Sequence, residues 1–191
     1  MHAGARTCQR PRPGPRIAFV AAASQIVPSI PGSLQEPFRS ALAAASEAWA
    51  ADLGERLISL VLFGSVARGR ARDSSDIDLV VIAEGFPSSL RDRRRPLLAL
   101  WETARAARGL PAMTWNLVTK SREEASYHTP LYLDIVEDGV LILDREGFFE
   151  KILHEMRQRM RALGSRRIYL DDGTWYWNLK PDFHFGEVVE I

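Results

Sequence analysis

Residues 64–80 read GSVARGRARDSSDIDLV, and the apolar runs on either side of this stretch decide the fold. The run LISLVLF at 57–63 ends at a Gly-Ser turn, and the run LVVIA at 79–83 follows two aspartates that only Ile77 separates. Short apolar runs bounded by turn residues indicate strands that are buried on both faces. Carboxylates at the start of such a strand are costly without a partner, so Asp76 and Asp78 need one.

Working outward, the rest of the chain predicts alternating helices and strands. SLQE at 33–36 has the form of a capping box, which predicts a helix that begins at Ser33 and ends at Gly54. Apolar spacing and turn signals predict the other elements. The helices are expected from Arg95 or Pro96 to Arg108 and at 121–125, 130–139 and 148–163, and the further strands at 76–83, 112–119 and 140–144. The sequence therefore predicts a small α/β (α+β) fold, a mixed sheet flanked by helices.

The chain divides into three expected parts. Residues 1–32 are rich in Pro and Arg and are expected to form a disordered tail, either a plain extension or a basic arm that contacts nucleic acid. Residues 33–145 are expected to form the main domain. Residues 146–191 are expected to add a C-terminal helix and an aromatic β-hairpin around DDGT, packed on that domain.

Composition excludes several classes of protein. The net charge of +1 over 191 residues gives no general attraction to nucleic acid, although a local contact stays open. The single cysteine, Cys8, excludes an internal disulfide and a cysteine zinc cluster. No apolar run has the length of a membrane span, and IAFVAAA at 17–23 is too short for a convincing signal peptide. We therefore expect a soluble cytoplasmic protein without a membrane partner.

The quoted stretch contains the parts of a phosphate and metal site. Asp76 and Asp78 are two positions apart on a strand, so their side chains share a face, and a hard cation such as Mg²⁺ would satisfy both. Gly64 lets a phosphate approach the backbone, Ser65 adds a hydroxyl donor, and Arg68 lies one helical turn further on. The alternative is a surface strand whose aspartates form salt bridges with the abundant arginines.

The spacing is neither a Walker A loop nor a dinucleotide-binding fingerprint, because it lacks Gly-Lys-Ser/Thr and G-x-G-x-x-G. It closely resembles the signature of the minimal nucleotidyltransferases of the DNA polymerase β-like superfamily. The matching residues are Gly64, Ser65, Ala67, Arg68, Gly69, Ser75, Asp76, Asp78 and Leu79. The resemblance implies the polymerase β-like nucleotidyltransferase fold and an NTP substrate. It implies one or two Mg²⁺ ions on Asp76 and Asp78, which are the expected catalytic residues, and phosphate binding by Gly64, Ser65, Arg68 and Ser75.

One part of the family pattern is missing. A third carboxylate usually lies on a neighbouring strand, yet the expected strand, AMTWNLVT at 112–119, has none, and Thr114 or Asn116 stands at that position. Neither is a good general base at neutral pH. Four nearby acids stay open as substitutes, namely Glu123, Glu124, Asp134 and Glu137.

The resemblance also suggests a biological setting. It implies transfer of a nucleoside monophosphate to a protein, an RNA end or a small molecule. Relatives of this size are often prokaryotic antitoxins, some of which modify a HEPN-type partner toxin. The alternative is a catalytically degenerate module that binds a nucleotide or a protein through the same fold. The missing third carboxylate favours this alternative.

Overall fold

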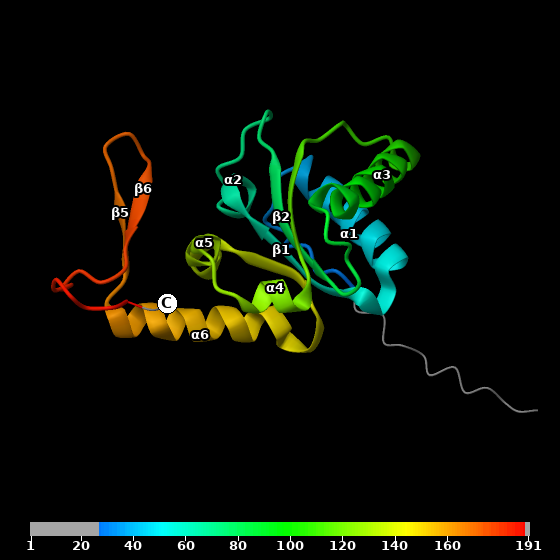
Figure 1. Cartoon of the computed structure of the whole chain (residues 1–191). Coiled ribbons are helices and arrows are strands. Elements are labelled where there is room, and N and C mark those ends of the chain that lie inside the picture. The colour runs from blue at the N-terminus through cyan, green and yellow to red at the C-terminus, as the bar shows by residue number, and fades with distance from the viewer. Residues whose placement is uncertain (1–26, 190–191) are drawn as a thin grey trace, which may run out of the picture.

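The computed structural model describes residues 27–189, which form a four-stranded mixed sheet with helices on both faces (Figure 1). The strand order is β3-β2-β1-β4, in which β1 pairs antiparallel with β2 and β4, and β2 pairs parallel with β3. The strands are β1 (Leu57–Phe63), β2 (Ile77–Ala83), β3 (Trp115–Lys120) and β4 (Val140–Asp144). The predicted fold class, a mixed sheet flanked by helices, is confirmed.

The helices divide between the two faces of the sheet. One face is covered by α1 (Phe38–Leu53) and α3 (Leu90–Arg108), and the other by α4 (Arg122–Ser126), α5 (Pro130–Asp138) and α6 (Phe148–Leu163). The short helix α2 (Gly64–Ala67) lies between β1 and β2, and single 3₁₀ turns span Gly54–Arg56 and Arg145–Gly147. Because both faces are covered, β1 and β2 are buried almost along their whole length, as their unbroken apolar sequences predict.

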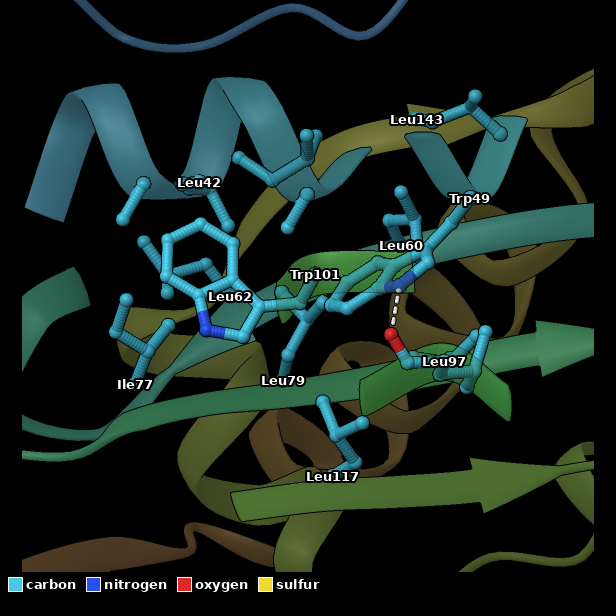
Figure 2. Packing of buried hydrophobic residues seen from close by; sticks show 14 of the residues in the cluster. Leu42, Trp49, Leu60, Leu62, Ile77, Leu79, Leu97, Trp101, Leu117 and Leu143 are labelled. Carbon is cyan, nitrogen blue, oxygen red and sulfur yellow. Dashed lines mark hydrogen bonds between the residues drawn. The ribbon is translucent and has the colours of Figure 1, made fainter. Parts of the chain in front are cut away.

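The core between the sheet and α1/α3 is built around three tryptophans. The Trp115 ring meets Trp49 and Trp101 edge-to-face at centroid distances of 5.3 and 5.2 Å. The Trp49 Nε1 donates a hydrogen bond of 2.8 Å to the Leu97 carbonyl, which joins α1 to α3 (Figure 2). Trp115 is therefore a packing residue.

The alternation along β2 places the aspartates. Ile77, Leu79 and Val81 belong to the α1/α3 core, whereas Val80 and Ile82 belong to the core under α5 and α6. Because side chains alternate along a strand, Asp78 points to the same side as Val80, toward α5. It lies at the start of the strand and stays half-buried.

Two predicted helix starts were wrong. Helix α1 begins at Phe38 rather than Ser33, because Pro37 disfavours helical backbone at the residue before it, and the Glu36 carboxylate instead accepts from the Ser40 N–H at 3.2 Å. Helix α3 begins at Leu90, capped by Ser89, and runs through Pro96 instead of starting there. It does so because its inward residues Arg93, Leu97 and Trp101, spaced four apart, are all buried and anchor the helix on both sides of the proline.

The other predicted elements are close to the observed ones. Helix α4 has the predicted capping box, in which Ser121 accepts from the Glu124 N–H and the Glu124 side chain accepts from the Ser121 N–H. Helix α6 matches its predicted bounds and ends at Gly164, whose φ of 68° is in the left-handed region. Strand β3 starts at Trp115, three residues later than predicted.

The C-terminal hairpin consists of β5 (Arg166–Tyr169) and β6 (Trp175–Asn178) around the predicted DDGT turn. It rises from the far end of α6 and stands on the side of α2 (Figure 1). Within residues 27–189, no helix combines the length and apolarity that crossing a membrane requires. The predicted tail and the apolar run at 17–23 lie outside the described residues, apart from residues 27–32.

Candidate functional site

The turn after β1 packs its backbone directly against Asp78. Gly64 has a φ of 75°, and a Cβ atom built on it would lie 2.0 Å from Asp78 Oδ2. Phe63 is paired with Asp78 across β1 and β2, so the strand register itself fixes this approach. Only glycine fits here, because any side chain would overlap the carboxylate and also strain the backbone.

The second oxygen of Asp78 is oriented from the neighbouring strand. Asn116 is paired with Asp78 in the parallel β2–β3 register, and its Nδ2 donates to Asp78 Oδ1 at 2.9 Å. The structure therefore brings Asn116 to the predicted third position, where it orients the carboxylate that faces Gly64. Thr114 lies just before β3 with an exposed side chain, and its carbonyl accepts from the Ile77 N–H at 2.9 Å.

The two aspartates lack a basic partner. Asp76 is exposed immediately before β2. Within the described range 27–189, no Lys, Arg or His nitrogen lies within 4.0 Å of either carboxylate, although nine salt bridges form elsewhere in the same range. The alternative of a surface strand with salt bridges to arginine is therefore not what the structure shows.

The loop between α2 and β2 is shaped by Ser75. Its hydroxyl accepts from the Arg72 N–H at 2.9 Å, and its own N–H donates to the Arg72 carbonyl at 2.8 Å. The Ser75 hydroxyl hydrogen is left for another acceptor. Ser65 is half-buried at the start of α2, and its carbonyl accepts from the Arg70 N–H at 2.9 Å. Ser65 thus lies in the helix that precedes the loop, and Ser75 lies at the end of the loop, next to Asp76.

Arg68 is held by parts of the chain that the sequence did not connect with it. Its Nη1 lies 3.8 Å from Asp138 Oδ2 on α5, and its Cζ lies 4.9 Å from the ring centroid of Trp175 on β6. Its side chain is only 21% exposed, which is low for an arginine on a loop. No signal in the sequence pairs these residues, because the contact depends on where the hairpin folds back.

Two of the acids that stayed open as substitutes have structural roles. Glu124 accepts a pair of hydrogen bonds from buried Arg93, and these bonds lower the pKa of Glu124 to about 2. Asp134 Oδ1 accepts from Arg167 and from the indole nitrogens of Trp175 and Trp177 at 3.0–3.1 Å.

The exposed acids Glu123 and Glu137 do not complete a site either. Within residues 27–189, no three His, Cys, Asp or Glu side chains are grouped so that they could hold a metal ion together. A metal ion on Asp76 and Asp78 would therefore need oxygens from elsewhere, and phosphate oxygens are the usual complement for Mg²⁺.

The chain is similar to known proteins in sequence. A family model described as "Nucleotidyltransferase domain" matches residues 45–143, slightly more than half of the chain. A Methanocaldococcus jannaschii protein named "Putative protein adenylyltransferase MJ1305" is 31% identical over 119 residues, which cover 62% of this chain and 79% of that protein.

The chain is also similar to solved structures. The crystal structure of a toxin-antitoxin with AMP-PNP has a TM-score of 0.42 at 22% identity, and that of the toxin-antitoxin MntA-HepT has a TM-score of 0.37 at 20% identity. Each match covers 62% of this chain and 88% of the other. From the family model and the curated relative, the chain belongs to the nucleotidyltransferase domain family and is a nucleotidyltransferase.

Proposed function

We propose that this nucleotidyltransferase is Mg²⁺-dependent and that it transfers a nucleoside monophosphate from an NTP to an acceptor through Asp76 and Asp78. The observation that carries the proposal is the pair of aspartates without a basic partner, one of them packed on the Gly64 turn. Two neighbouring carboxylates repel each other and are stabilised by an external cation. An oxygen-rich pair beside a glycine turn fits Mg²⁺ together with a triphosphate.

Each residue of the motif has a role in this proposal. Gly64 leaves room for the Asp78 carboxylate against the backbone of the turn. The Ser65 hydroxyl and the Arg68 guanidinium donate hydrogen bonds to phosphate oxygens. Ser75 keeps the loop in shape and offers its hydroxyl hydrogen. Asn116 holds Asp78 so that its second oxygen faces the turn.

The bond changes follow from the family chemistry. An oxygen of the acceptor bonds to the α-phosphorus, the bond from that phosphorus to the bridging oxygen of the pyrophosphate breaks, and the acceptor proton is released. Mg²⁺ held by Asp76 and Asp78 would supply the positive charge that offsets the entering and leaving oxygens. The chain's own residues align the triphosphate, which is the main protein contribution in such reactions.

For the acceptor we propose a protein side chain and for the donor ATP. The support is the name of the M. jannaschii relative, a protein adenylyltransferase, of which this chain covers 79%. That the modified protein is a HEPN-type toxin, with this chain as its antitoxin, rests on the resemblance of the signature at 64–80 and stays a prediction. Co-expression with a HEPN-type protein and mass spectrometry for added AMP would test it.

The site itself is tested by calorimetry with ATP and GTP, with and without Mg²⁺. We expect binding that needs Mg²⁺ in the wild type, and the double variant Asp76→Asn/Asp78→Asn should lose both binding and transfer of label from α-labelled ATP. The matched control is Asp73→Asn, an exposed aspartate in the same loop. Unchanged transfer by the folded double variant would refute the assignment of the site. No nucleotide binding by the wild type would refute the proposed reaction.

A further inference from the structure

Arg68 connects the nucleotide motif to the C-terminal hairpin. Arg68 follows α2 directly, and its guanidinium lies against the Trp175 ring and near Asp138. We propose that Trp175 and Asp138 are positioning residues that hold the Arg68 guanidinium toward the phosphates of the bound nucleotide. This inference rests on the proposed function, in which Arg68 binds those phosphates.

The Trp175 side chain is held in place by contacts with three neighbouring residues. Its Nε1 donates to Asp134 Oδ1 at 3.1 Å, and the Arg167 Cζ lies 5.1 Å from its ring centroid. The Tyr169 ring, opposite it on β5, lies 6.2 Å away. A ring fixed by three neighbours can orient a fourth group, and a cation over its face is attracted to the ring electrons.

Asp138 holds Arg68 loosely because it is bound more closely by another arginine. Its Oδ2 accepts from Arg167 Nη1 at 2.7 Å, whereas Arg68 Nη1 stays at 3.8 Å, beyond hydrogen-bond distance. Arg167 therefore offsets much of the Asp138 charge that would otherwise draw Arg68 in. The attraction that remains fixes the direction of the Arg68 side chain without occupying its donors.

The guanidinium of Arg68 is consequently oriented but unsatisfied. None of its N–H groups makes a hydrogen bond to any other residue in the range 27–189, yet the side chain is only 21% exposed. An arginine offers five donors in a planar fork that matches phosphate geometry. A fork fixed in place before the ligand arrives loses less side-chain entropy on binding.

The test compares two tryptophans of the same hairpin. Trp177 Nε1 also donates to Asp134 Oδ1, at 3.0 Å, and Arg167 Cζ lies 5.1 Å from its ring, but Arg68 stacks on Trp175 and not on Trp177. With ATP and Mg²⁺ as the probe, Trp175→Leu should weaken binding about 3- to 10-fold, the effect of losing a partly exposed cation–π contact. Trp177→Leu should change binding less than about 2-fold, because it leaves the Arg68 contact intact.

Further variants separate positioning from damage to the fold. In an Arg68→Ala background, Trp175→Leu should have no added effect, since the group that it positions is gone. Trp175→Gln keeps an N–H donor for Asp134 and removes the ring, so it should weaken binding as Leu does. Trp175→Tyr restores a ring and should bind within about 2-fold of the wild type. The Michaelis constant for ATP should follow these changes more closely than kcat.

The failures of the two proposals are distinguishable. If Asp76→Asn/Asp78→Asn abolishes binding while Trp175→Leu and Trp175→Gln leave it unchanged, the positioning role is refuted and the proposed function stands. If Trp175→Leu weakens binding equally with and without Arg68, the effect is structural and the positioning role is also refuted. If the aspartate variant still binds and transfers, the proposed function itself is wrong.

Discussion

The chain contains two pairs of aspartates whose surroundings are opposite. Asp134 and Asp138 lie one turn apart on α5, and both carboxylates accept hydrogen bonds from Arg167. Asp134 also accepts hydrogen bonds from the indole nitrogens of Trp175 and Trp177. Asp76 and Asp78 lie two positions apart at the start of β2 without a basic partner among residues 27–189. The first pair is neutralised by the protein and the second is not.

This difference separates structural acids from functional ones more clearly than their sequence positions do. A carboxylate that is paired and hydrogen-bonded contributes to stability, because removing it leaves buried donors and a buried cation unsatisfied. An unpaired, partly buried carboxylate lowers stability and is kept for another reason, such as binding a cation. Substitutions should therefore affect folding at Asp134 and activity at Asp76 and Asp78.

The largest effect is expected from Gly64→Ala. The new Cβ would lie 2.0 Å from Asp78 Oδ2, so the carboxylate must move, and the φ of 75° adds backbone strain. We expect metal-dependent ATP binding to disappear and transfer to fall at least about 100-fold. The control is Gly69→Ala, which has a similar φ of 65° but no atom within 4 Å, so it adds backbone strain of about 1 kcal/mol without the collision. Equal activity of the two variants would show that the close approach to Asp78 has no functional role.

The same isosteric change in each aspartate pair should give opposite results. Asp134→Asn removes the carboxylate charge to which Arg167 and two indole N–H groups donate hydrogen bonds. The substitution should lower the free energy of unfolding by about 2–3 kcal/mol. Asp78→Asn removes an unpaired charge and should change it by less than about 1 kcal/mol while abolishing transfer. Urea unfolding and the transfer assay measure both. A strongly destabilised Asp78→Asn would mean that this carboxylate also supports the fold.

A third kind of carboxylate, Glu124, should make the free energy of unfolding depend on pH. Its pKa is lowered to about 2 by Arg93, so its stabilising effect is complete above the ordinary pKa near 4.5 and is lost as the pH falls toward 2. Because the side chain is 46% exposed, we expect Glu124→Gln to cost only about 1 kcal/mol at pH 7. The difference from the wild type should shrink between pH 4.5 and pH 2 in chemical unfolding. If the difference in the free energy of unfolding between the wild type and Glu124→Gln stayed constant over that range, the Arg93 contact would be excluded as its cause. Glu123→Gln is the control.

Much of the fold could be predicted from local signals, and the site only in part. The apolar runs of β1 and β2, the capping box of α4 and the glycine after α6 all act within a few residues, so the sequence shows them. The run RDRRR at 91–95 consists only of charged residues, yet Arg93 is buried and bonded to Glu124. Such a pairing depends on tertiary packing, which a single sequence does not display.

The same limit applies to the site. The motif placed Gly64 and Asp78 in one predicted site, because a turn and the strand that follows it are close along the chain. It did not predict that Asn116 orients Asp78, which follows from the parallel register of β2 and β3. The contact between Arg68 and Trp175 of the hairpin could not be predicted from the sequence either. The start of α1 was a different case, because Pro37 was visible in the sequence and gave sufficient warning.

The smallest effect is expected at an exposed ion pair. Arg108 Nη2 on α3 lies 2.6 Å from Glu47 Oε2 on α1, and the two side chains are 46% and 55% exposed. Water screens such a pair, so Glu47→Gln should lower the free energy of unfolding by less than about 0.5 kcal/mol and leave ATP binding unchanged. The remaining difference should vanish in 1 M salt, where the screening length is about 3 Å. A larger loss of stability would show that a short distance alone lets a carboxylate stabilise the fold. We expect instead that this contribution depends on burial of the partner arginine, as for Arg93 and Arg167.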